Sequence, residues 1–337
     1  MNATMSLENT KHYPVMLNQI LSIISPQHGG TYIDCTFGGG GYSKAILKFP
    51  STKVIAIDRD QLAEKYASIL LKEFPKRFDF FREKFSNVNQ IVENNLNPRA
   101  VIFDLGFSSF QLSDEERGFS FDSKNFLNME MGKNKYSAYD VVNNFSKEGL
   151  GEIIKILGEE KDGKIIANKI DKYRKKKPIE TSHELASIVN SVKKSKRNYK
   201  KNPATKTFQA IRIFVNQELT ELISGLIEAA KLLYDGGMLV VVSFHSLEDK
   251  IVKNFFNLYS GLRKNYSRYL PIQENKPSLF KSVSKKPFIP SVKEISQNIR
   301  SRSAKLRYGI RNKNSFFYPD EFKRMFSNYL ELESKTK

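Results

Sequence analysis

The stretch Thr31–Ser43, TYIDCTFGGGGYS, joins a short apolar segment to four consecutive glycines and then to the start of a helix. A plain strand-to-helix turn does not need four glycines. They remove every Cβ atom from the turn, so backbone N–H groups can approach a ligand and positive φ angles carry no steric cost. The stretch therefore predicts a buried strand followed either by a tight turn alone or by a ligand-binding turn.

An acidic residue at the end of the next apolar segment favours the ligand-binding turn. Val54–Asp58, VIAID, has the character of a buried strand and ends on a carboxylate. In nucleotide-binding α/β folds the glycines pass beneath the ligand, and an acid at the tip of the second strand binds the ribose hydroxyls. We therefore interpret the glycine turn and Asp58 as parts of one nucleoside site.

The chain is long and strongly basic. Its 337 residues, 40% of them hydrophobic, suffice for one large α/β domain and a smaller one. The net charge of +19 indicates an anionic partner, with nucleic acid the leading class, although a lysine-rich solvated surface would give the same total.

Cysteine usage and hydropathy indicate the cellular compartment and exclude some classes of partner. Cys35 is the only cysteine, which excludes a disulfide scaffold and a cysteine-based zinc site, and we predict no metal. A reducing cytoplasm fits this composition. No apolar run has the length of a membrane span, and the N-terminus lacks the apolar core of a signal peptide, so no membrane partner is expected.

Strands and helices alternate through residue 104, which predicts a doubly wound, mostly parallel sheet. Strands are expected near Thr31–Cys35, Val54–Asp58, from Phe78, and at Ala100–Asp104 and Met238–Phe244, with a late edge strand at Ser303–Asn312. The main predicted helices are His12–Ile24, Ser43–Lys48, Gln61–Phe74, Val88–Asn95, one long helix over Thr207–Tyr234, and Pro319–Glu333. We leave Leu258–Pro290 unassigned.

A second unit interrupts this alternation. Phe107–Met131 is long, irregular and aromatic-rich, which is typical of a functional loop, and Ser137–Val192 has helical periodicity throughout. We therefore expect an α/β domain over 1–110 and 203–337 and an inserted all-helical domain over 111–202. Two basic runs, Lys172–Lys177 and Lys193–Lys201, suit either nucleic-acid contact or solvated linkers, and Tyr199 in the second would add base stacking.

Several motifs lie in order over nearly the whole chain. They are HYPVML from His12, DCTFGGGGYS from Asp34, AIDRD from Ala56, DLGFSSFQL from Asp104, RGFSF from Arg117, GEE from Gly158, NPATKTFQAIRIFVNQEL from Asn202, SFHSLEDKIVK from Ser243 and RSRSAKLR from Arg300. Together they resemble the bacterial 16S rRNA cytosine-N4 methyltransferase family, RsmH (MraW).

The resemblance implies a fold, a reaction and a partner. The fold is the class I S-adenosylmethionine (SAM) methyltransferase fold, Rossmann-like, with the helical insert recognising substrate. The reaction is methyl transfer from SAM, without a metal, to the N4 amine of a decoding-centre (P-site) cytidine in 16S rRNA. The partner is this rRNA within an assembled or assembling 30S subunit, and the oligomeric state stays open.

The resemblance also assigns residues. The methionine part of SAM would lie against Gly40, Gly41 and Tyr42, the ribose on Asp58, the adenine on Phe85, and the sulfonium beside Asp104 and Gln111. The chain departs from the family where it has Tyr42 and Asn202 in place of His, Asn128 and Glu130 in place of Asp and Arg, and Phe107 in place of a small aliphatic residue. The departures concern the substrate channel and leave the cofactor pocket intact.

Two residues are candidates for catalysis. Asp104 ends the fourth strand, where open α/β sheets bind ligands, and its carboxylate could orient the target amine or contact SAM; the alternative is a helix N-cap. His245 follows the fifth strand and could take a proton from the methylated amine, but a His that fixes its loop by hydrogen bonding is the favoured interpretation.

Three residues are candidates for RNA contact. Phe107 could stack on an extruded base, and Lys206 and Arg212 could contact phosphates or instead hold the loop after Asp104. A dinucleotide oxidoreductase is disfavoured because the third fingerprint glycine is missing. The remaining alternatives are a SAM-dependent amine methyltransferase acting on another nucleic acid, a protein methyltransferase, and a non-catalytic RNA-binding protein on this fold.

Overall fold

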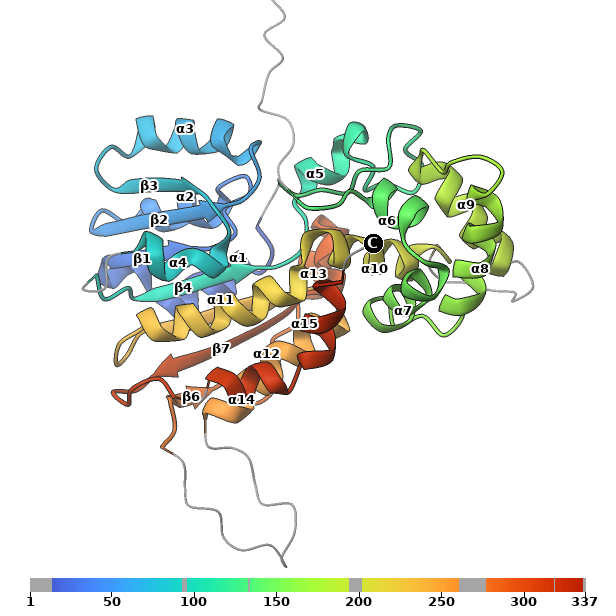
Figure 1. The fold of residues 1–337 in the computed structure, drawn as a ribbon. Coiled ribbons are helices and arrows are strands. Elements are labelled where there is room, and N and C mark those ends of the chain that lie inside the picture. The colour runs from blue at the N-terminus through green and yellow to red at the C-terminus, as the bar shows by residue number, and fades with distance from the viewer. Residues whose placement is uncertain are drawn as a thin grey trace, which may run out of the picture.

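The structure is a computed structural model that describes residues 14–92, 96–132, 134–193, 202–260, 277–317 and 319–335. In these ranges the strands form a seven-stranded sheet in the order β3-β2-β1-β4-β5-β7-β6 (Figure 1). Their bounds are β1 Gly30–Asp34, β2 Thr52–Asp58, β3 Phe78–Arg82, β4 Ala100–Asp104, β5 Met238–Ser243, β6 Phe280–Val283 and β7 Lys305–Arg311. The doubly wound sheet expected from the sequence is confirmed.

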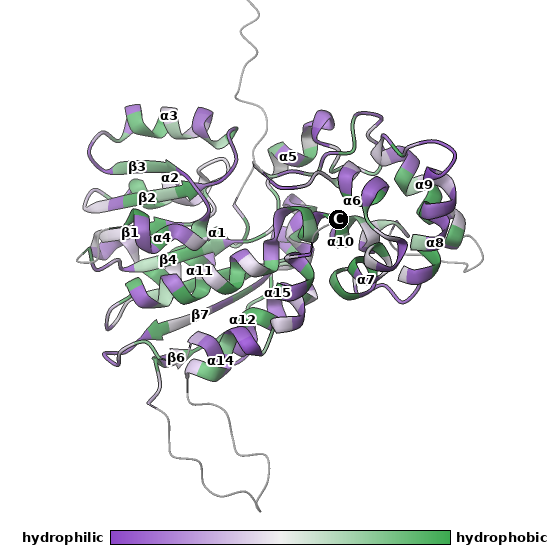
Figure 2. Ribbon diagram, viewed as in Figure 1, coloured by the Kyte–Doolittle hydropathy of each residue, from purple (hydrophilic) through white to green (hydrophobic). Residues whose placement is uncertain are grey.

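The five strands β1 to β5 are parallel, and β7 runs antiparallel to β5. Alternate strand residues enter two separate buried clusters: Ile33 and Ile55 belong to one, and Tyr32 and Val54 to the other. Both faces of the sheet are thus covered, which is why β2, β4 and β5 contain continuous apolar runs (Figure 2).

Different helices cover the two faces. The cluster that contains Tyr32 includes residues of α1 Leu17–Ile24, α2 Gly41–Leu47 and α3 Ala63–Glu73. The cluster that contains Ile33 includes residues of α4 Val88–Ile91, α11 Glu218–Leu232 and α12 Ser246–Tyr259. Short elements complete this part: η1 Pro26–His28, η2 Phe85–Asn87, α13 Val292–Gln297, η4 Ile299–Ser303, α14 Pro319–Arg324 and α15 Ser327–Glu333.

A helical lobe lies beside the sheet (Figure 1). It contains α5 Ser109–Ser113, η3 Glu115–Arg117, α6 Ala138–Asn144, α7 Lys147–Leu157, α8 Gly163–Arg174, α9 Ser182–Lys193 and α10 Thr205–Asn216. Serine side chains cap α6 and α7, where Ser137 and Ser146 accept backbone N–H groups. Leu150 of α7 and Leu226 of α11 belong to the same buried cluster, so one core runs through both parts. The domain boundaries at 110 and 203 stay a prediction.

The prediction of one long helix over Thr207–Tyr234 is wrong. It is divided into α10 and α11 at Gln217, which adopts a left-handed conformation with φ 51°. Glu218 then turns back and receives the Arg212 guanidinium. Gln217 is of a residue type that is common in helices, and the apolar residues on both sides of it keep helical spacing. The sequence pattern therefore did not reveal the break.

Three other expected helices begin or end elsewhere. The N-terminal helix begins at Leu17, not near Pro14, because Met16 is left-handed with φ 56°. The expected C-terminal helix is two helices, α14 and α15, interrupted near Phe326, where φ is −128°. The helix predicted over Val88–Asn95 ends earlier, at Ile91, because Val92 is extended with φ −97° and ψ 128°. Residues 93–95 lie outside the described residues.

The strand predicted over Ser303–Asn312 is present, but its predicted place at an edge of the sheet is wrong. β7 lies inside the sheet, between β5 and β6. The edge strand β6 comes from the unassigned part of the sequence. Part of that segment, 261–276, is not described by the structure.

The second basic run begins with a residue that does not face solvent. Lys193 is buried, and its Nζ lies 2.6 Å from a carboxylate oxygen of Glu160. The rest of the run, 194–201 with Tyr199, lies outside the described residues. Among the residues that are described, no helix combines the length and apolar character needed to cross a bilayer.

Candidate active site

A pocket lies at the carboxyl ends of the parallel strands, the edge where open α/β sheets bind ligands. Each strand contributes near its tip: Cys35 follows β1, Asp58 ends β2, Asp104 ends β4 and Phe244 follows β5. Further lining residues include Pro14, Val15, Gly38, Gly39, Gly41, Tyr42, Arg59, Phe85, Phe107, Gln111, Met131, Glu248, Asn298 and Arg300.

The glycine turn is packed too closely for side chains. A Cβ on Gly39 would lie 2.6 Å from the Phe110 ring, and one on Gly41 would lie 2.3 Å from Pro14. Gly40 has φ +76°, donates its N–H to Phe37 and is not among the lining residues. The turn thus presents bare backbone to the pocket through Gly39 and Gly41, with Gly40 turned away.

Buried carboxylates hold this turn from beneath. Asp34 accepts the Ser43 hydroxyl at 2.7 Å, and burial raises the pKa of Asp34 to about 6. Asp58 accepts the backbone N–H of Gly38 at 2.7 Å and that of Asp60 at 2.8 Å, and burial raises its pKa to about 6 as well. Asp58 therefore fixes the turn while also lining the pocket.

Asp60 connects this strand tip to the loop that crosses the pocket. Its buried carboxylate accepts both terminal nitrogens of Arg117 and the side-chain amide of Gln111. The carbonyl of that amide accepts the Ser108 N–H and closes a capping box on α5. Gln111 lines the pocket as expected, but its polar atoms are used to anchor the loop to Asp60.

Phe85 lines the pocket on a rigid support. Its ring meets Phe103 edge to face, and Gly225 of α11 lies beneath it, where a Cβ would come within 2.6 Å. The Glu221 carboxylate accepts hydrogen bonds from the N–H and the hydroxyl of Ser86, and thereby fixes the η2 turn that carries Phe85.

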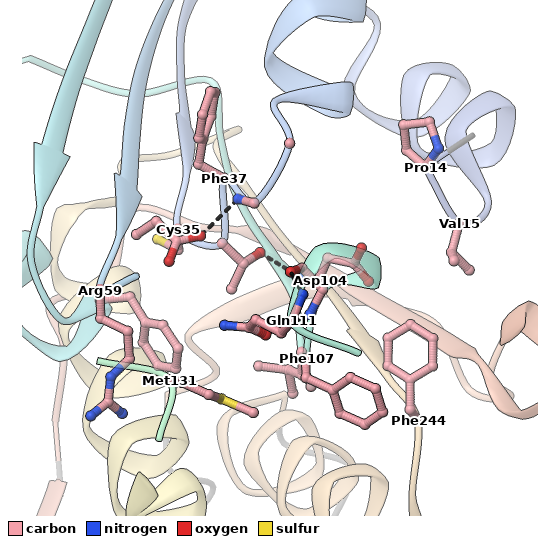
Figure 3. Close-up of a pocket in the computed structure, with 18 of the residues that line it drawn as sticks. Pro14, Val15, Cys35, Phe37, Arg59, Asp104, Phe107, Gln111, Met131 and Phe244 are labelled. Carbon is pink, nitrogen blue, oxygen red and sulfur yellow. Dashed lines mark hydrogen bonds between the residues drawn. The ribbon is translucent and has the colours of Figure 1, made fainter. Parts of the chain in front are cut away.

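Asp104 is the most unusual polar group of the pocket. Its N–H donates to the Thr36 hydroxyl at 2.6 Å, while its Oδ1 is buried without a hydrogen-bond partner among the described residues (Figure 3). Burial, together with the negative charge of Asp34, raises the pKa of Asp104 to about 8. The nearby Tyr42 hydroxyl acts in the opposite direction on this pKa.

Tyr42 links the turn to the N-terminal segment. Its hydroxyl donates to the carbonyl of Val15, and burial together with the Asp104 charge raises the pKa of this hydroxyl well above its ordinary value. The residue thus holds Pro14 and Val15 against the pocket, in addition to lining it.

Two phenylalanines lie at one end of the pocket. In Figure 3 the rings of Phe107 and Phe244 lie toward Val15, away from Arg59. Phe107 stacks on Phe119 with 5.8 Å between ring centroids, and the Arg212 guanidinium lies 4.9 Å from the Phe107 ring.

The two predicted phosphate ligands have other partners here. Arg212 is largely buried and makes a bidentate pair with Glu218, with both N–O distances at 2.8 Å. It therefore holds the loop after Asp104 through Phe107. Lys206 is exposed, donates to the carbonyl of Glu159 and does not line the pocket.

His245 is not among the lining residues, and it lies at the N-cap of α12. Its Nδ1 accepts the Glu248 N–H, and its Nε2 lies 3.1 Å from the Glu248 carboxylate. This is the loop-fixing role favoured from the sequence. Glu218, His245 and Glu248 are close enough to share a cation, but Arg212 already occupies Glu218, so we interpret the group as an ion-pair cluster.

Sequence reasoning missed several lining residues: Val15, Phe244, Glu248, Asn298 and Arg300. Phe244 could have been predicted from the sequence, because it follows the fifth parallel strand. It therefore lies at the same edge of the sheet as Asp104, which ends the fourth. No comparable signal marked Asn298 and Arg300, which reach the pocket from a segment nearly two hundred residues further along the chain than Asp104.

The strand order, the glycine turn and the acids at neighbouring strand tips define a class I SAM-dependent methyltransferase fold. Comparison with known sequences specifies the family: residues 9–312 match the family described as the MraW methylase family, and the chain belongs to it.

Curated relatives are similar over most of their length. A protein of Ehrlichia canis named ribosomal RNA small subunit methyltransferase H is 47% identical over 299 residues, 88% of this chain and 98% of that one. One of the same name from Parvibaculum lavamentivorans is 42% identical over 88% of each chain. Among solved structures, an rRNA methylase from Streptococcus thermophilus has a TM-score of 0.39 at 10% identity, covering 87% of this chain and 96% of that one.

Proposed function

We propose that this protein transfers a methyl group from SAM to the exocyclic N4 amine of a cytidine in small-subunit ribosomal RNA. Two observations support the proposal. Curated relatives at 42–47% identity carry the name ribosomal RNA small subunit methyltransferase H, and in the pocket of this chain one carboxylate oxygen of Asp104 is buried without a hydrogen-bond partner among the described residues.

The residues of the pocket fit SAM. The backbone of Gly39 and Gly41 lines the pocket and can come close to the methionine part, and Asp58 at the tip of β2 is placed for ribose hydroxyls. Phe85 offers an apolar face for the adenine. The unpaired oxygen of Asp104 matches a positively charged ligand group, because a cation nearby would lower the pKa that burial has raised.

When bound, SAM supplies a methyl group on a positively charged sulfur. The chain must then place the target amine in line with that methyl. The cytosine N4 lone pair is delocalised into the ring, so the amine is a weak nucleophile. A carboxylate of Asp104 that accepts an N4–H hydrogen bond would direct the lone pair toward the methyl, and we assign this positioning to Asp104.

The aromatic end of the pocket suits a nucleobase. Phe107 is 37% exposed, and contacts with Phe119 and Arg212 fix the position of its ring. Phe244 offers a second ring in the same part of the pocket. A base can reach this site only after leaving its stack, so we propose that the target cytidine is extruded.

The proposal extends to the setting of the reaction. We propose the decoding-centre (P-site) cytidine of 16S rRNA as the target, an assembled or assembling 30S subunit as the substrate, and the cytoplasm as the location. The net charge of +19 is consistent with a large anionic partner.

Mapping of methylated cytidine tests the function directly. Small subunits from cells that lack the protein are incubated with methyl-labelled SAM and the purified chain, and the 16S rRNA is digested and sequenced by mass spectrometry. The expected result is a methyl group on N4 of one cytidine. Label on another nucleic acid or on protein would favour the alternative substrates, and SAM binding absent by calorimetry would favour a non-catalytic RNA-binding protein.

An Asp104→Ala variant tests the catalytic assignment. Methyl transfer should fall by about two orders of magnitude or more, because positioning of the amine is lost. Normal turnover together with normal SAM affinity in this variant would contradict the role given to Asp104.

A further inference from the structure

A short loop after α13 reaches the mouth of the pocket from the C-terminal part of the chain. Asn298 and Arg300 both line the pocket. Ile299 lies between them in η4, and 67% of its surface is exposed. Ile299 does not itself line the pocket, so a large and exposed aliphatic residue lies in the chain directly between two residues that do.

The loop is anchored at both ends, so Ile299 is held in place. Before it, the Glu294 carboxylate accepts the N–H of Met16, next to the pocket residue Val15. Within it, the Asn298 side chain accepts the Arg300 N–H, and Ser301 is fully buried and donates to the Asn298 carbonyl. A side chain fixed in this way loses little freedom when it is covered.

The surface around the loop combines apolar and positively charged side chains. Phe288 is 45% exposed and Ile289 70%. Exposed cations of the same segment are Lys285, Lys286, Lys293, Arg300 and Arg302. Apolar groups that meet bases, among cations that meet phosphates, are the composition of a nucleic-acid contact surface.

We propose that Ile299 is a wedge that enters the base stack beside the target nucleotide, filling the gap left when that nucleotide moves into the pocket. Arg300 binds the adjoining backbone phosphate. The inference rests on the proposed function and names a substrate-positioning residue for it. We propose that an RNA strand covers this surface. Ile299 lies between two residues of the pocket, and the exposed charges of the same segment are positive.

The energetic reason for a wedge is the cost of extrusion. Unstacking a base costs free energy, and proteins that deform nucleic acids offset this cost with inserted apolar side chains such as Ile, Leu, Met and Phe. At 67% exposure, Ile299 has surface available to bury in this way.

Three variants test the wedge: Ile299→Ser, Ile299→Met and Val292→Ser. Val292 is the matched control, because it is an exposed apolar residue of the same segment that does not line the pocket. For each, kcat and KM are measured on small subunits, and SAM affinity by calorimetry. Ile299→Ser should lose about tenfold or more in kcat/KM, as expected when an inserted wedge is removed, with SAM affinity unchanged. Ile299→Met and Val292→Ser should stay within about threefold of the unchanged protein.

The outcomes separate the wedge from the proposed function. If the unchanged protein transfers no methyl group to small subunits, the proposed function fails and the wedge fails with it. If the unchanged protein is active and Ile299→Ser is equally active, the wedge alone is overturned. Equal losses in Ile299→Ser and Val292→Ser would also overturn it, since they would show a general docking surface, as for a ribosomal protein.

Discussion

At the scale of single residues, the site depends on carboxyl groups that are costly to bury. Asp34, Asp58 and Asp104 lie at the ends of neighbouring parallel strands, and burial raises the pKa of each. The first two are hydrogen-bonded within the chain, whereas Asp104 keeps an unpaired oxygen. Such a group lowers the stability of the free protein and is satisfied by a ligand.

Replacing Asp104 by Asn should stabilise the folded protein while it impairs methyl transfer. The folded protein keeps the Asp104 proton up to about pH 8, and the unfolded chain releases it at about pH 4. Folding therefore binds a proton between these values, and stability falls as pH rises through that window. At pH 8 the free energy of unfolding of Asp104→Asn should exceed that of the unchanged protein by about 1 kcal/mol or more.

Urea denaturation at pH 5, 7 and 9 measures this difference. The gain should grow from pH 5 to pH 8 and then level off. Asp122→Asn, at an exposed position, is the control and should change little. A gain that is the same at every pH would argue against a buried, proton-binding Asp104.

SAM should bind more tightly as pH rises from about 6 to about 8, because the positively charged ligand favours ionised Asp104. The dissociation constant should fall by up to about tenfold per pH unit in this window. Calorimetry can check this with 5′-methylthioadenosine as the control ligand, since it lacks both the ammonium and the sulfonium charge. A flat profile for SAM, or the same slope in Asp104→Asn, would remove Asp104 from the explanation.

At the scale of elements, the turn between β1 and α2 works because other elements close on it. Pro14 of the N-terminal segment and Phe110 of α5 occupy the space where side chains of the turn would lie. The turn is thus shaped by parts of the chain that come before and after it in sequence.

Gly39→Ala should weaken SAM binding. Its Cβ would meet the Phe110 ring at 2.6 Å, so either the ring or the turn must move, at a cost of about 1–3 kcal/mol. Gly151→Ala in α7 is the control, because the nearest atoms around a Cβ there belong to α8 and lie at 3.5 Å or beyond. It should leave binding unchanged and stabilise the helix by about 0.5–1 kcal/mol. Equal SAM affinity in both variants would contradict the turn as a binding element.

Glu333→Ala should destabilise the protein by about 2–3 kcal/mol, because it leaves buried donors at the start of α11 without a partner. The Glu333 carboxylate accepts the N–H groups of Leu219 and Thr220 from its place on α15. Glu331→Ala, at an exposed position of the same helix, is the control. Chemical denaturation measures both, and similar losses would show that the cap contributes nothing.

The sequence predicted the elements whose signal is local. Asp58 and Asp104 were found because each ends an apolar strand, and the sheet followed from the alternation of strands and helices. The break at Gln217 could not be found in this way, since a left-handed residue there depends on the Arg212–Glu218 pair across it. Arg300 at the pocket was likewise set by tertiary packing, through anchors such as the Glu294–Met16 hydrogen bond.

At the scale of the whole molecule, charge is the dominant property. The net charge of +19 predicts that binding to the rRNA substrate depends steeply on salt. Each phosphate contact contributes about −0.7 to −0.9 to the slope of log affinity against log salt, so a slope steeper than about −2 is expected for several contacts. Filter binding at 50–300 mM salt, with SAM affinity as the insensitive control, measures it. A slope near zero would indicate that the basic residues serve only solubility.

The buried cluster that runs without interruption from the sheet into the helical lobe has a mechanical consequence. Two bodies that share one close-packed interior cannot swing apart like jaws, because opening them would expose apolar surface along the whole seam. We therefore expect a preformed site, so that the conformational change needed for methyl transfer falls on the rRNA. The rate of turnover should then depend on how readily the rRNA exposes its target nucleotide, with little contribution from motion of the protein.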